Sequence, residues 1–424
     1  MTPIEMIVRT LILILLLGLI DLYVFQGVKT ISRNFTPTTQ RNIQIAFWLL
    51  NAVCCTILIA GVTISDYHSW NKVFRTYAFA FILIFYFSKV FFIAFLLIDD
   101  ISRVFQFVYT KLKGNDSLSN DYNTSGYISR HDFIVKTGLV IAAIPFISMV
   151  AGMVKGAYNY TIHRVKIKHA GIPKEFNGFK IVQISDIHSG SFTFEHKVDR
   201  AVEMILNQKP DLVLFTGDLV NEMASEVLPF IETFKKITAP HGVFSILGNH
   251  DYGDYHQWPS AEDKQQNFDN LIQSHADIGW KLMMDEHQYI EKGDSKIGLL
   301  GVQNWSSHKR FPRHGDLIKA TNNFEPQSFN LLMSHDPSHW HGEVLDKYPF
   351  IHLTLSGHTH GMQFGIEIPG IKWSPVQYVY RQWAGLYSKE NQHLYVNRGL
   401  GFIGYPGRVG IMPEITVFEL VATS

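Results

Sequence analysis

The chain has 424 residues, and its 37 basic side chains balance its 37 acidic ones, so its formal charge at pH 7 is zero. Only 17% of the residues are charged, and they form no basic run of the kind that marks a nucleic-acid-binding protein. The two cysteines, Cys54 and Cys55, are adjacent in an apolar stretch, so the second half of the chain cannot form a disulfide of its own.

Four long apolar stretches occupy the first part of the chain, at about 10–26, 45–64, 77–98 and 133–154. Each is close to the ~20 residues that a helix needs to cross ~30 Å of hydrocarbon. None has the polar face that a surface helix of a soluble protein presents to water. We therefore predict a transmembrane region of about four helices over 1–155, followed by a second domain over 156–424.

Two ionisable residues, Asp21 and Lys89, fall inside these apolar stretches. An unpaired charge in hydrocarbon is costly, so such residues usually face the interior of a bundle or reach to an interface. The sequence leaves two alternatives open: the side chains pair with each other, or Asp21 lies near a helix end and reaches the headgroups. A transport or lipid-binding role also stays open.

A polar, turn-rich segment at 114–126 is predicted to be a flexible loop. It is followed by Ser129-Arg130-His131-Asp132-Phe133-Ile134, which is similar to a twin-arginine export signal with His131 in place of the second arginine. The alternative is a basic residue that merely flanks a membrane helix.

Five apolar, β-branched runs in the second half each end at residues that can bind a metal. The runs cover 180–185, 211–216, 243–247, 330–334 and 351–356. Short apolar runs bounded by Gly, Asp or Pro are typical of buried strands. Ligands of open α/β sheets bind in the loops after the carboxyl ends of the strands. The metal-binding residue types in these loops are Asp186, His188, Asp218, Asn249, His335, His358 and His360.

Other patterns around these strands predict a mixed α/β fold. Apolar residues share one face of an amphipathic helix at 197–207, between the first two strands. Later segments predict hairpins, at 288–302 with a turn at Gly293-Asp294, and at 363–373 with a turn near Pro369-Gly370.

The seven metal-binding residues offer imidazole, carboxylate and amide groups, a set that suits divalent ions such as Mn, Fe and Zn. Seven ligands are too many for one tetrahedral or octahedral site, so we expect two divalent metal ions that share a carboxylate. Two metals about 3.5–4 Å apart stabilise the attacking hydroxide and the leaving oxygen of a displacement at phosphorus, and a water that bridges them ionises near neutral pH. The pattern therefore predicts a metal-dependent phosphoric ester hydrolase.

The ordered motifs resemble those of the calcineurin-like metallophosphoesterase family. The motifs are Asp186-Ile187-His188, Gly217-Asp218, Gly248-Asn249-His250-Asp251, His335 and Gly357-His358-Thr359-His360. The stretches 394–401 and 413–418 are also similar to the bacterial branch of exported or membrane-attached phosphoesterases. The resemblance covers about 160–420 and implies an α/β fold of two packed β-sheets flanked by helices, with the metals at one edge.

The resemblance also implies a role for each site residue. One ion would be held by Asp186, His188, Asp218 and His360, and the other by Asp218, Asn249, His335 and His358, with Asp218 as the bridge. His250 would protonate the leaving oxygen or stabilise the charge on phosphorus, with the alternative that it only orients a metal ligand. Arg398, in a Gly-rich loop, either contacts a substrate phosphate through its planar guanidinium or ties that loop down.

The membrane anchor predicts a phosphate-ester substrate near the bilayer, for instance a lipid-linked or envelope-linked phosphomonoester or phosphodiester. Lys and Arg residues divide equally between the two sides, so they do not set the orientation; the export-signal pattern favours an extracytoplasmic catalytic domain in a multi-pass cell-membrane protein. Two other functions stay open. They are a cytoplasm-facing pyrophosphatase of a nucleotide-linked lipid precursor, and a non-catalytic sensor or transporter subunit that binds metal or phosphate. The sequence does not predict the oligomeric state.

Overall fold

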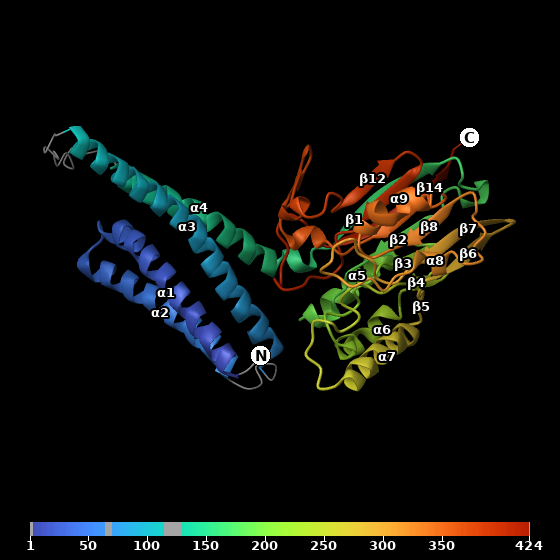
Figure 1. The fold of residues 1–424 in the computed structure, drawn as a ribbon, viewed down its shortest axis with the longest axis horizontal. Coiled ribbons are helices and arrows are strands. Elements are labelled where there is room, and N and C mark those ends of the chain that lie inside the picture. The colour runs from blue at the N-terminus through green and yellow to red at the C-terminus, as the bar shows by residue number, and fades with distance from the viewer. Residues whose placement is uncertain (1–2, 64–69, 114–128, 424) are drawn as a thin grey trace. The chain divides into compact units, whose positions relative to one another are not determined.

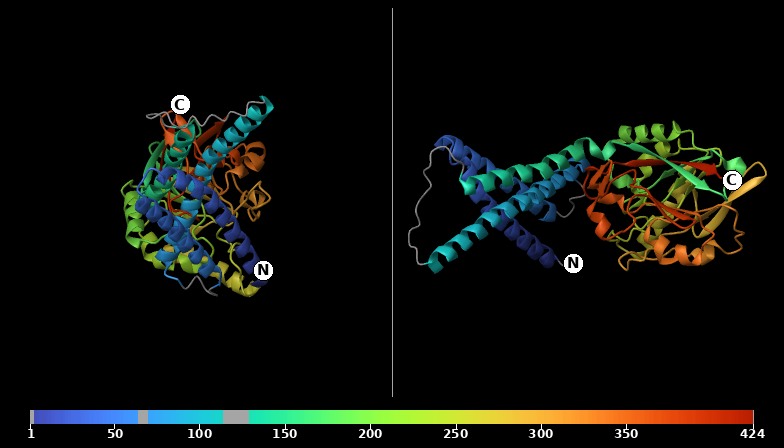
Figure 2. Two further views of the ribbon diagram at one scale, coloured as in Figure 1. Left: turned by 90° about the vertical axis from the view of Figure 1, so that its left-hand side faces the viewer. Right: turned by 90° about the horizontal axis from the view of Figure 1, so that it is seen from above.

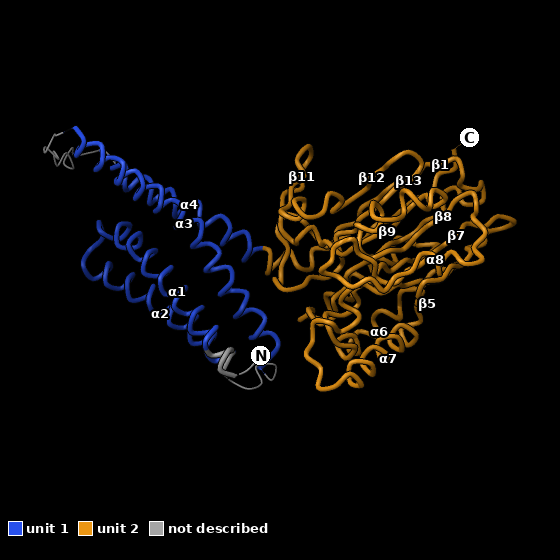
Figure 3. The backbone as a smooth tube through the Cα atoms, viewed as in Figure 1, with its two compact units in different colours: residues 1–151 blue, residues 152–424 orange. Residues whose placement is uncertain are grey.

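The computed structural model describes residues 3–63, 70–113 and 129–423. It divides into two compact units, Met1–Ala151 and Gly152–Ser424 (Figure 3). The boundary predicted from the sequence, between 155 and 156, lies four residues after this division.

The first unit consists of four long helices that are long and apolar enough to span a membrane (Figure 1). They are α1 (Pro3–Ser32), α2 (Pro37–Thr63), α3 (Lys72–Lys113) and α4 (Arg130–Val154). The prediction of four spanning helices is confirmed; each helix begins before the apolar stretch that predicted it, and α3 also continues well beyond its stretch. This helix continues past the apolar stretch to Lys113, because 99–113 contain no Gly or Pro to stop it. The predicted loop at 114–126 lies outside the described residues.

Asp21 and Lys89 pair inside the helical unit. The Lys89 Nζ atom lies 2.5 Å from Asp21 Oδ1 and 2.5 Å from Asn51 Oδ1. Tyr86 donates its hydroxyl to the other Asp21 oxygen at 3.0 Å. All four side chains are buried, so the first of the two alternatives holds and α1, α2 and α3 share one polar cluster.

The export-signal-like stretch forms the start of α4. His131, which stands in place of an arginine, places Nδ1 2.8 Å from Asp99 Oδ2, and Asp132 pairs with Arg33. The stretch therefore contributes contacts among α1, α3 and α4.

The second unit contains two six-stranded sheets. The first sheet has the order β1-β14-β2-β3-β4-β5, and its strands β2 to β5 run parallel. The second has the order β12-β13-β9-β8-β7-β6, with β7, β8, β9 and β13 parallel. The strands of the first sheet are β1 (Thr161–His169), β2 (Lys180–Ile184), β3 (Leu212–Phe215), β4 (Val243–Ser245), β5 (Lys281–Leu282) and β14 (Glu414–Ala422). Those of the second are β6 (Glu286–Lys292), β7 (Ser295–Gly301), β8 (Asn330–Met333), β9 (Leu353–Ser356), β12 (Gly385–Lys389) and β13 (Gln392–Val396).

The two sheets pack face to face on a common apolar core. Ile181 and Leu212 of the first sheet belong to the same buried cluster as Leu331 and Leu353 of the second. Helices cover the outer faces, and the right-hand view of Figure 2 shows green and orange helices on opposite sides of the strands. These helices are α5 (Glu195–Leu206), α6 (Ile231–Phe234), α7 (Ala261–Ile278), α8 (Leu317–Ala320) and α9 (Leu345–Lys347). The predicted architecture, two packed sheets flanked by helices, is confirmed.

The predicted local elements are also present. Helix α5 buries Val198, Ala201, Val202 and Ile205 along one face, as its periodicity predicts. Strands β6 and β7 form the first predicted hairpin, and β10 (Ile366–Ile368) and β11 (Ile371–Trp373) form the second. The five predicted strands that precede the metal-binding residues are β2, β3, β4, β8 and β9.

Candidate metal centre

Each of the predicted metal-binding residues lies in a loop that begins where one of these strands ends. Strands β2, β3 and β4 are parallel neighbours in one sheet, and β8 and β9 are parallel neighbours in the other. Their carboxyl ends therefore lie at one edge of the sandwich. The backbone amide of Asp186 donates to the carbonyl of Gly217, and Gly357 donates to His335, so neighbouring loops are joined directly.

The backbone of these loops is unusual. Five of the predicted ligands have positive φ: Asp186 (51°), His188 (48°), Asp218 (61°), His358 (72°) and His360 (50°). Left-handed backbone costs a residue with a Cβ of order 1–3 kcal/mol and tends to gather at functional sites. All five residues belong to the two groups of possible metal ligands described below.

Two glycines allow the loops to come close to the carboxylates. Gly217 has φ +95°, and a Cβ there would lie 2.6 Å from the amide nitrogen of Gly248. A Cβ on Gly357 would lie 2.1 Å from Asp186 Oδ2. A side chain at either position would push apart the strands that hold the site.

One group of possible ligands consists of Asp186, His188 and His360, which are all buried. The Nε2 atoms of His188 and His360 lie 3.0 Å apart, and His360 Nε2 is 3.3 Å from Asp186 Oδ1. Such close carboxylate and imidazole atoms have the composition and spacing of a metal site.

The second group consists of Asp218, His335 and His358. His335 Nε2 is 3.1 Å from Asp218 Oδ2. Asn249 joins this group, since its Oδ1 lies 2.7 Å from His358 Nδ1. The amide nitrogen of Asn249 donates to Tyr255 Oη at 2.9 Å, which leaves Oδ1 directed into the site.

Asp218 connects the two groups. Its Oδ2 is 3.1 Å from His335 of the second group and 3.5 Å from His188 of the first. The structure thus brings all seven predicted residues together, with the carboxylate that was expected to bridge in the middle. Their individual roles as ligands stay predictions.

The electrostatics of the residues fit divalent cations. Burial lowers the pKa of His188 to about 3 and that of His358 to about 4, so both rings are neutral at pH 7. Burial also raises the pKa of Asp186 to about 6. Apart from its contact with Asp218, His335 Nε2 has no hydrogen-bond partner among the described residues.

At His335, a proton balances the negative charge of the neighbouring carboxylate. Burial opposes its charged form, but the Asp218 carboxylate more than compensates and raises the pKa of His335 to about 10. The Nδ1 atom lies 2.7 Å from the carbonyl of Thr216, which can only accept, so Nδ1 carries a hydrogen. A cation between Nε2 and Asp218 would replace the second proton, which is the usual exchange when a metal site fills.

His250 lies beside the cluster. Its ring is 5.0 Å from that of His188 and 4.5 Å from that of Tyr255, and its backbone amide donates to Asp218 Oδ1 at 2.9 Å. Its Nδ1 is 2.7 Å from the carbonyl of Asn221. Nδ1 must therefore be the donor, and Nε2 is the atom that can exchange a proton.

Arg398 is bound on both sides by carboxylates of the chain. It pairs with Glu367 and Glu414 and is only 3% exposed. These contacts favour the alternative that Arg398 ties its loop down. They give no support to the predicted contact with a substrate phosphate, because the guanidinium is buried and each of its three nitrogens donates to a carboxylate of the chain.

Several residues around the site were not predicted. The carboxylate of Asp251 accepts from the amides of Gly248, Asp218 and Leu219 at 2.8–2.9 Å and so fixes two of the loops that carry predicted ligands. Tyr380 places its hydroxyl 2.8 Å from His358 Nε2 and donates to Asp336 at 3.1 Å. Tyr380 follows no strand and belongs to no motif, so the sequence gives no signal for it.

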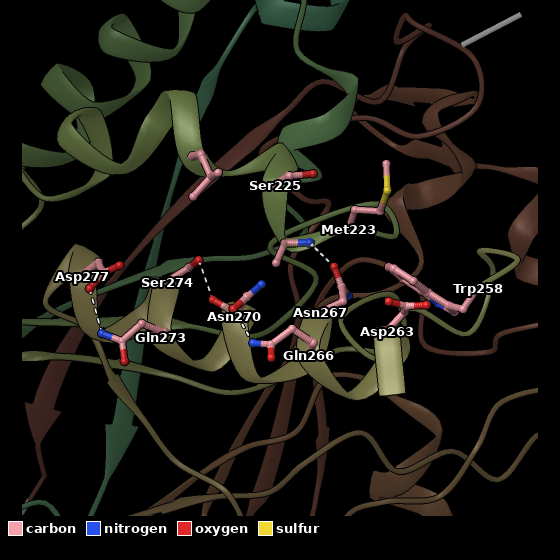
Figure 4. Close-up of a pocket in the computed structure, with 12 residues that line it drawn as sticks. Met223, Ser225, Trp258, Asp263, Gln266, Asn267, Asn270, Gln273, Ser274 and Asp277 are labelled. Carbon is pink, nitrogen blue, oxygen red and sulfur yellow. Dashed lines mark hydrogen bonds between the residues drawn. The ribbon is translucent and has the colours of Figure 1, made fainter. Parts of the chain in front are cut away.

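A separate cavity of about 460 Å³ lies between the 223–228 segment and α7 (Figure 4). Its wall consists mainly of amide and carboxylate side chains that bond to one another, such as Gln273 with Asp277 and Asn267 with the amide of Ala224. It contains none of the seven predicted ligands, and we assign it no role.

Comparison with known proteins identifies both units. Residues 6–157 match a domain family described as the probable calcineurin-like phosphoesterase transmembrane domain, and residues 179–362 match the calcineurin-like phosphoesterase domain. The chain is 32% identical over 265 residues to the uncharacterized metallophosphoesterase YkuE of Bacillus subtilis, covering 61% of this chain and 84% of that protein. It is 27% identical over 297 residues to the phosphodiesterase YaeI of Escherichia coli, covering 69% of this chain and all of that protein.

The name of a vertebrate relative also combines a transmembrane protein with a metallophosphoesterase domain. The chain is 30% identical over 287 residues to a zebrafish transmembrane protein with metallophosphoesterase domain, covering 66% of this chain and 60% of that protein. The match thus spans about three fifths of the length of this relative. These matches agree with the fold and with the motifs at the strand ends, and the chain therefore belongs to the calcineurin-like metallophosphoesterase family, with a four-helix phosphoesterase transmembrane domain before the catalytic domain.

Proposed function

We propose that this protein is a membrane-anchored phosphoesterase that uses two divalent metal ions, of the Mn, Fe or Zn kind, to hydrolyse phosphomonoester or phosphodiester bonds. The observation that supports this most is the position of Asp218, whose Oδ2 lies within 3.5 Å of an imidazole of each ligand group. A single carboxylate between two sets of ligands is what a pair of metals requires. When bound, the ions would supply positive charge to the phosphoryl group and lower the pKa of a water molecule toward neutrality.

The protein's own residues would fix the geometry of both ions. The Thr216 carbonyl orients His335, and Tyr255 orients Asn249. Partners of this kind keep a ligand in one tautomer and one rotamer, and losing such a partner typically costs about 10–100-fold in metal affinity or activity. Asp251, which holds the loops of Asp218 and Asn249, supports both groups at once.

His250 is proposed to act on the leaving group. Because Asn221 holds the hydrogen of Nδ1, a second proton on Nε2 is the one the ring can release. His250 is only partly buried, so a phosphoester at the cluster can reach it. Nε2 would give its proton to the leaving oxygen or stabilise charge on phosphorus.

We further propose that the substrate is a phosphodiester or phosphomonoester of a lipid or an envelope polymer. The tether of four membrane helices supports this, because it holds the catalytic domain next to lipid headgroups. The chain matches YaeI over the whole length of that protein, and the name of YaeI, phosphodiesterase, supports a phosphodiester substrate. An extracytoplasmic position for the catalytic domain is supported by the export-signal-like stretch 129–134.

The test uses the full chain in detergent with a panel of soluble and lipid phosphoesters. We expect hydrolysis that depends on an added divalent metal, is lost in Asp218→Asn and is kept in Asp346→Asn, which changes an exposed carboxylate of α9. Wild-type protein that is loaded with metal and inactive on every ester would contradict the proposal. A reporter fused after the C-terminus decides the side of the membrane independently.

A further inference from the structure

The β10–β11 hairpin has one apolar face and one charged face. In its register Ile366 lies opposite Trp373, Ile368 opposite Ile371, and Glu367 opposite Lys372. Opposed residues of an antiparallel pair point to the same side, and side chains alternate along each strand. Ile366, Ile368, Ile371 and Trp373 therefore share one face, and the two charged residues share the other.

The charged face is fixed to the catalytic domain. Glu367 pairs with the buried Arg398, which pairs in turn with Glu414 of β14. Lys372 donates to the carbonyl of Ala384 and lies 4.8 Å from the centre of the Trp383 ring. The hairpin cannot turn over without breaking these contacts, so its apolar face is held outward.

The apolar face is exposed. Ile366, Ile368 and Ile371 are 47%, 56% and 53% exposed, and within the described residues the sheet of β10 and β11 has no third strand. The hairpin projects from the body of the second unit (Figure 3). A two-stranded hairpin is marginal in water, and a contiguous apolar patch on a folded domain indicates a contact surface.

Further apolar side chains continue the patch toward the metal centre. Met362, two residues after His360, is 58% exposed, and Tyr378 and Val379 are 77% and 62% exposed. The next residue, Tyr380, contacts His358. The indole of Trp373 donates to the hydroxyl of Tyr378 at 3.4 Å, so an aromatic pair stands at the base of the hairpin. Trp and Tyr with polar tips are the residues that favour the headgroup level of a bilayer.

The root of the hairpin is joined to the end of the last membrane helix. Gly152, in the last turn of α4 and within the second unit, accepts from the backbone amide of Arg408. The next residue, Val409, forms a bridge with Phe364 and accepts from Gly365, directly before β10. Since the candidate membrane span of α4 ends at Val154, this contact places the root of the hairpin beside a residue of that span.

We propose that the β10–β11 hairpin, with Met362, Tyr378 and Val379, inserts its apolar face into the phospholipid interface and so presents lipid headgroups to the metal centre. Arg398 is then a positioning residue that orients the hairpin. The delivery of a lipid phosphoester rests on the proposed function, whereas the insertion itself does not. The occupant is the bilayer, because four candidate membrane helices tether the chain to one and because Trp373 and Tyr378 are residue types that favour the headgroup level.

The direct test places a fluorophore on the hairpin of the full chain. The native cysteines are replaced (Cys54→Ala, Cys55→Ala), Ile371→Cys is labelled with an environment-sensitive dye, and the protein is reconstituted into phosphatidylcholine–phosphatidylglycerol nanodiscs. Ile318→Cys in α8 is the matched control, since Ile318 is 72% exposed and outside the patch. We expect blue-shifted emission that spin-labelled lipid quenches at position 371 and not at 318. Equal, unquenched emission at both would overturn the proposal, as would emission at 371 that changes with protein concentration and not with quencher lipid.

A second variant separates insertion from catalysis. We expect Ile368→Ser with Ile371→Ser to lower hydrolysis of a bilayer-embedded phosphodiester by about tenfold, which corresponds to the loss of roughly one buried aliphatic side chain. Hydrolysis of a soluble nitrophenyl phosphodiester should not change, and Ile318→Ser should change neither rate. An equal fall on both substrates, or on neither, contradicts the proposal. Wild type that cleaves neither substrate refutes the proposed function and leaves the fluorophore result to decide the insertion.

Discussion

Each of the two units buries a cluster of charged side chains, and the two clusters differ in what completes them. In the membrane unit, Lys89 satisfies Asp21 and Asn51, and Tyr86 satisfies the remaining oxygen of Asp21, all within 3.0 Å. In the catalytic unit, two carboxylates face several imidazoles, and burial lowers the pKa of two of these, His188 and His358. The first cluster is complete with the chain's own atoms, whereas the second contains carboxylate and imidazole groups that could hold metal ions.

The largest effect is expected from Asp218→Asn. The amide keeps the shape of the side chain but removes the charge that both ligand groups share. We expect kcat/KM for a phosphodiester to fall by at least about a thousandfold, since metals supply several kcal/mol of charge stabilisation. Steady-state kinetics on the folded full chain measure this, with Asp346→Asn as the control. Activity within a few-fold of wild type would show that the carboxylate is not shared.

A smaller effect is expected from His250→Ala. General acid catalysis contributes about 10²–10⁴-fold, so kcat should fall within that range while the content of bound metal stays unchanged. His196→Ala, which removes an exposed histidine of α5, is the matched control. If metal is lost together with activity, His250 acts through the ligands and is not a proton donor.

Lys89→Met should affect stability and leave the chemistry intact. Removing one partner of a buried ion pair leaves Asp21 uncompensated, at a cost of about 3–5 kcal/mol. Denaturant titration of the full chain in mixed micelles, followed by circular dichroism, measures the change. The double variant Asp21→Asn, Lys89→Met should recover much of the loss. Lys136→Met, which removes an exposed lysine of α4, should have little effect. If Lys89→Met behaves like Lys136→Met, the buried cluster contributes no stability.

Metal removal, unlike Lys89→Met, should destabilise the catalytic unit and leave the stability of the membrane unit unchanged. A site that is saturated at 100 times its Kd gains about 2.7 kcal/mol from its ligand. Dialysis against a chelator should therefore lower the unfolding temperature of the catalytic unit and not that of the membrane unit. Calorimetry of the full chain before and after dialysis, and after return of Mn or Zn, measures both transitions. A transition of the catalytic unit that does not move would indicate that no metal contributes to its fold.

The parts of the molecule that could be predicted from sequence are those in which local patterns agree with the tertiary structure. Strand β3, before Asp218, is fully buried, and strand β2, before Asp186, is buried from Ile181 to Ile184, so both are rich in apolar residues. In each case a glycine, an aspartate or a histidine ends the run, and parallel pairing then brings these residues to one edge. Seven distant residues could be placed together because one topology explains all of them.

Contacts made by residues outside the motifs could not be predicted. Tyr380 reaches His358 from a loop, and Arg398 is neutralised by Glu367, which lies 31 residues away in a hairpin. Such pairs depend on how the loops approach one another in the fold, which the periodicity of apolar residues in the sequence does not predict. The end of α3 was also missed, because hydropathy marks where a helix leaves the hydrocarbon and not where the helix stops.

The number of metal ions bound by the wild-type full chain tests the central claim most directly. Elemental analysis of protein that is purified in detergent, saturated with Mn or Zn and freed of excess metal should give two equivalents per chain. Asp218→Asn should hold fewer than two. A wild-type chain that never binds more than one equivalent, or an Asp218→Asn chain that still binds two, would contradict the proposed dinuclear centre.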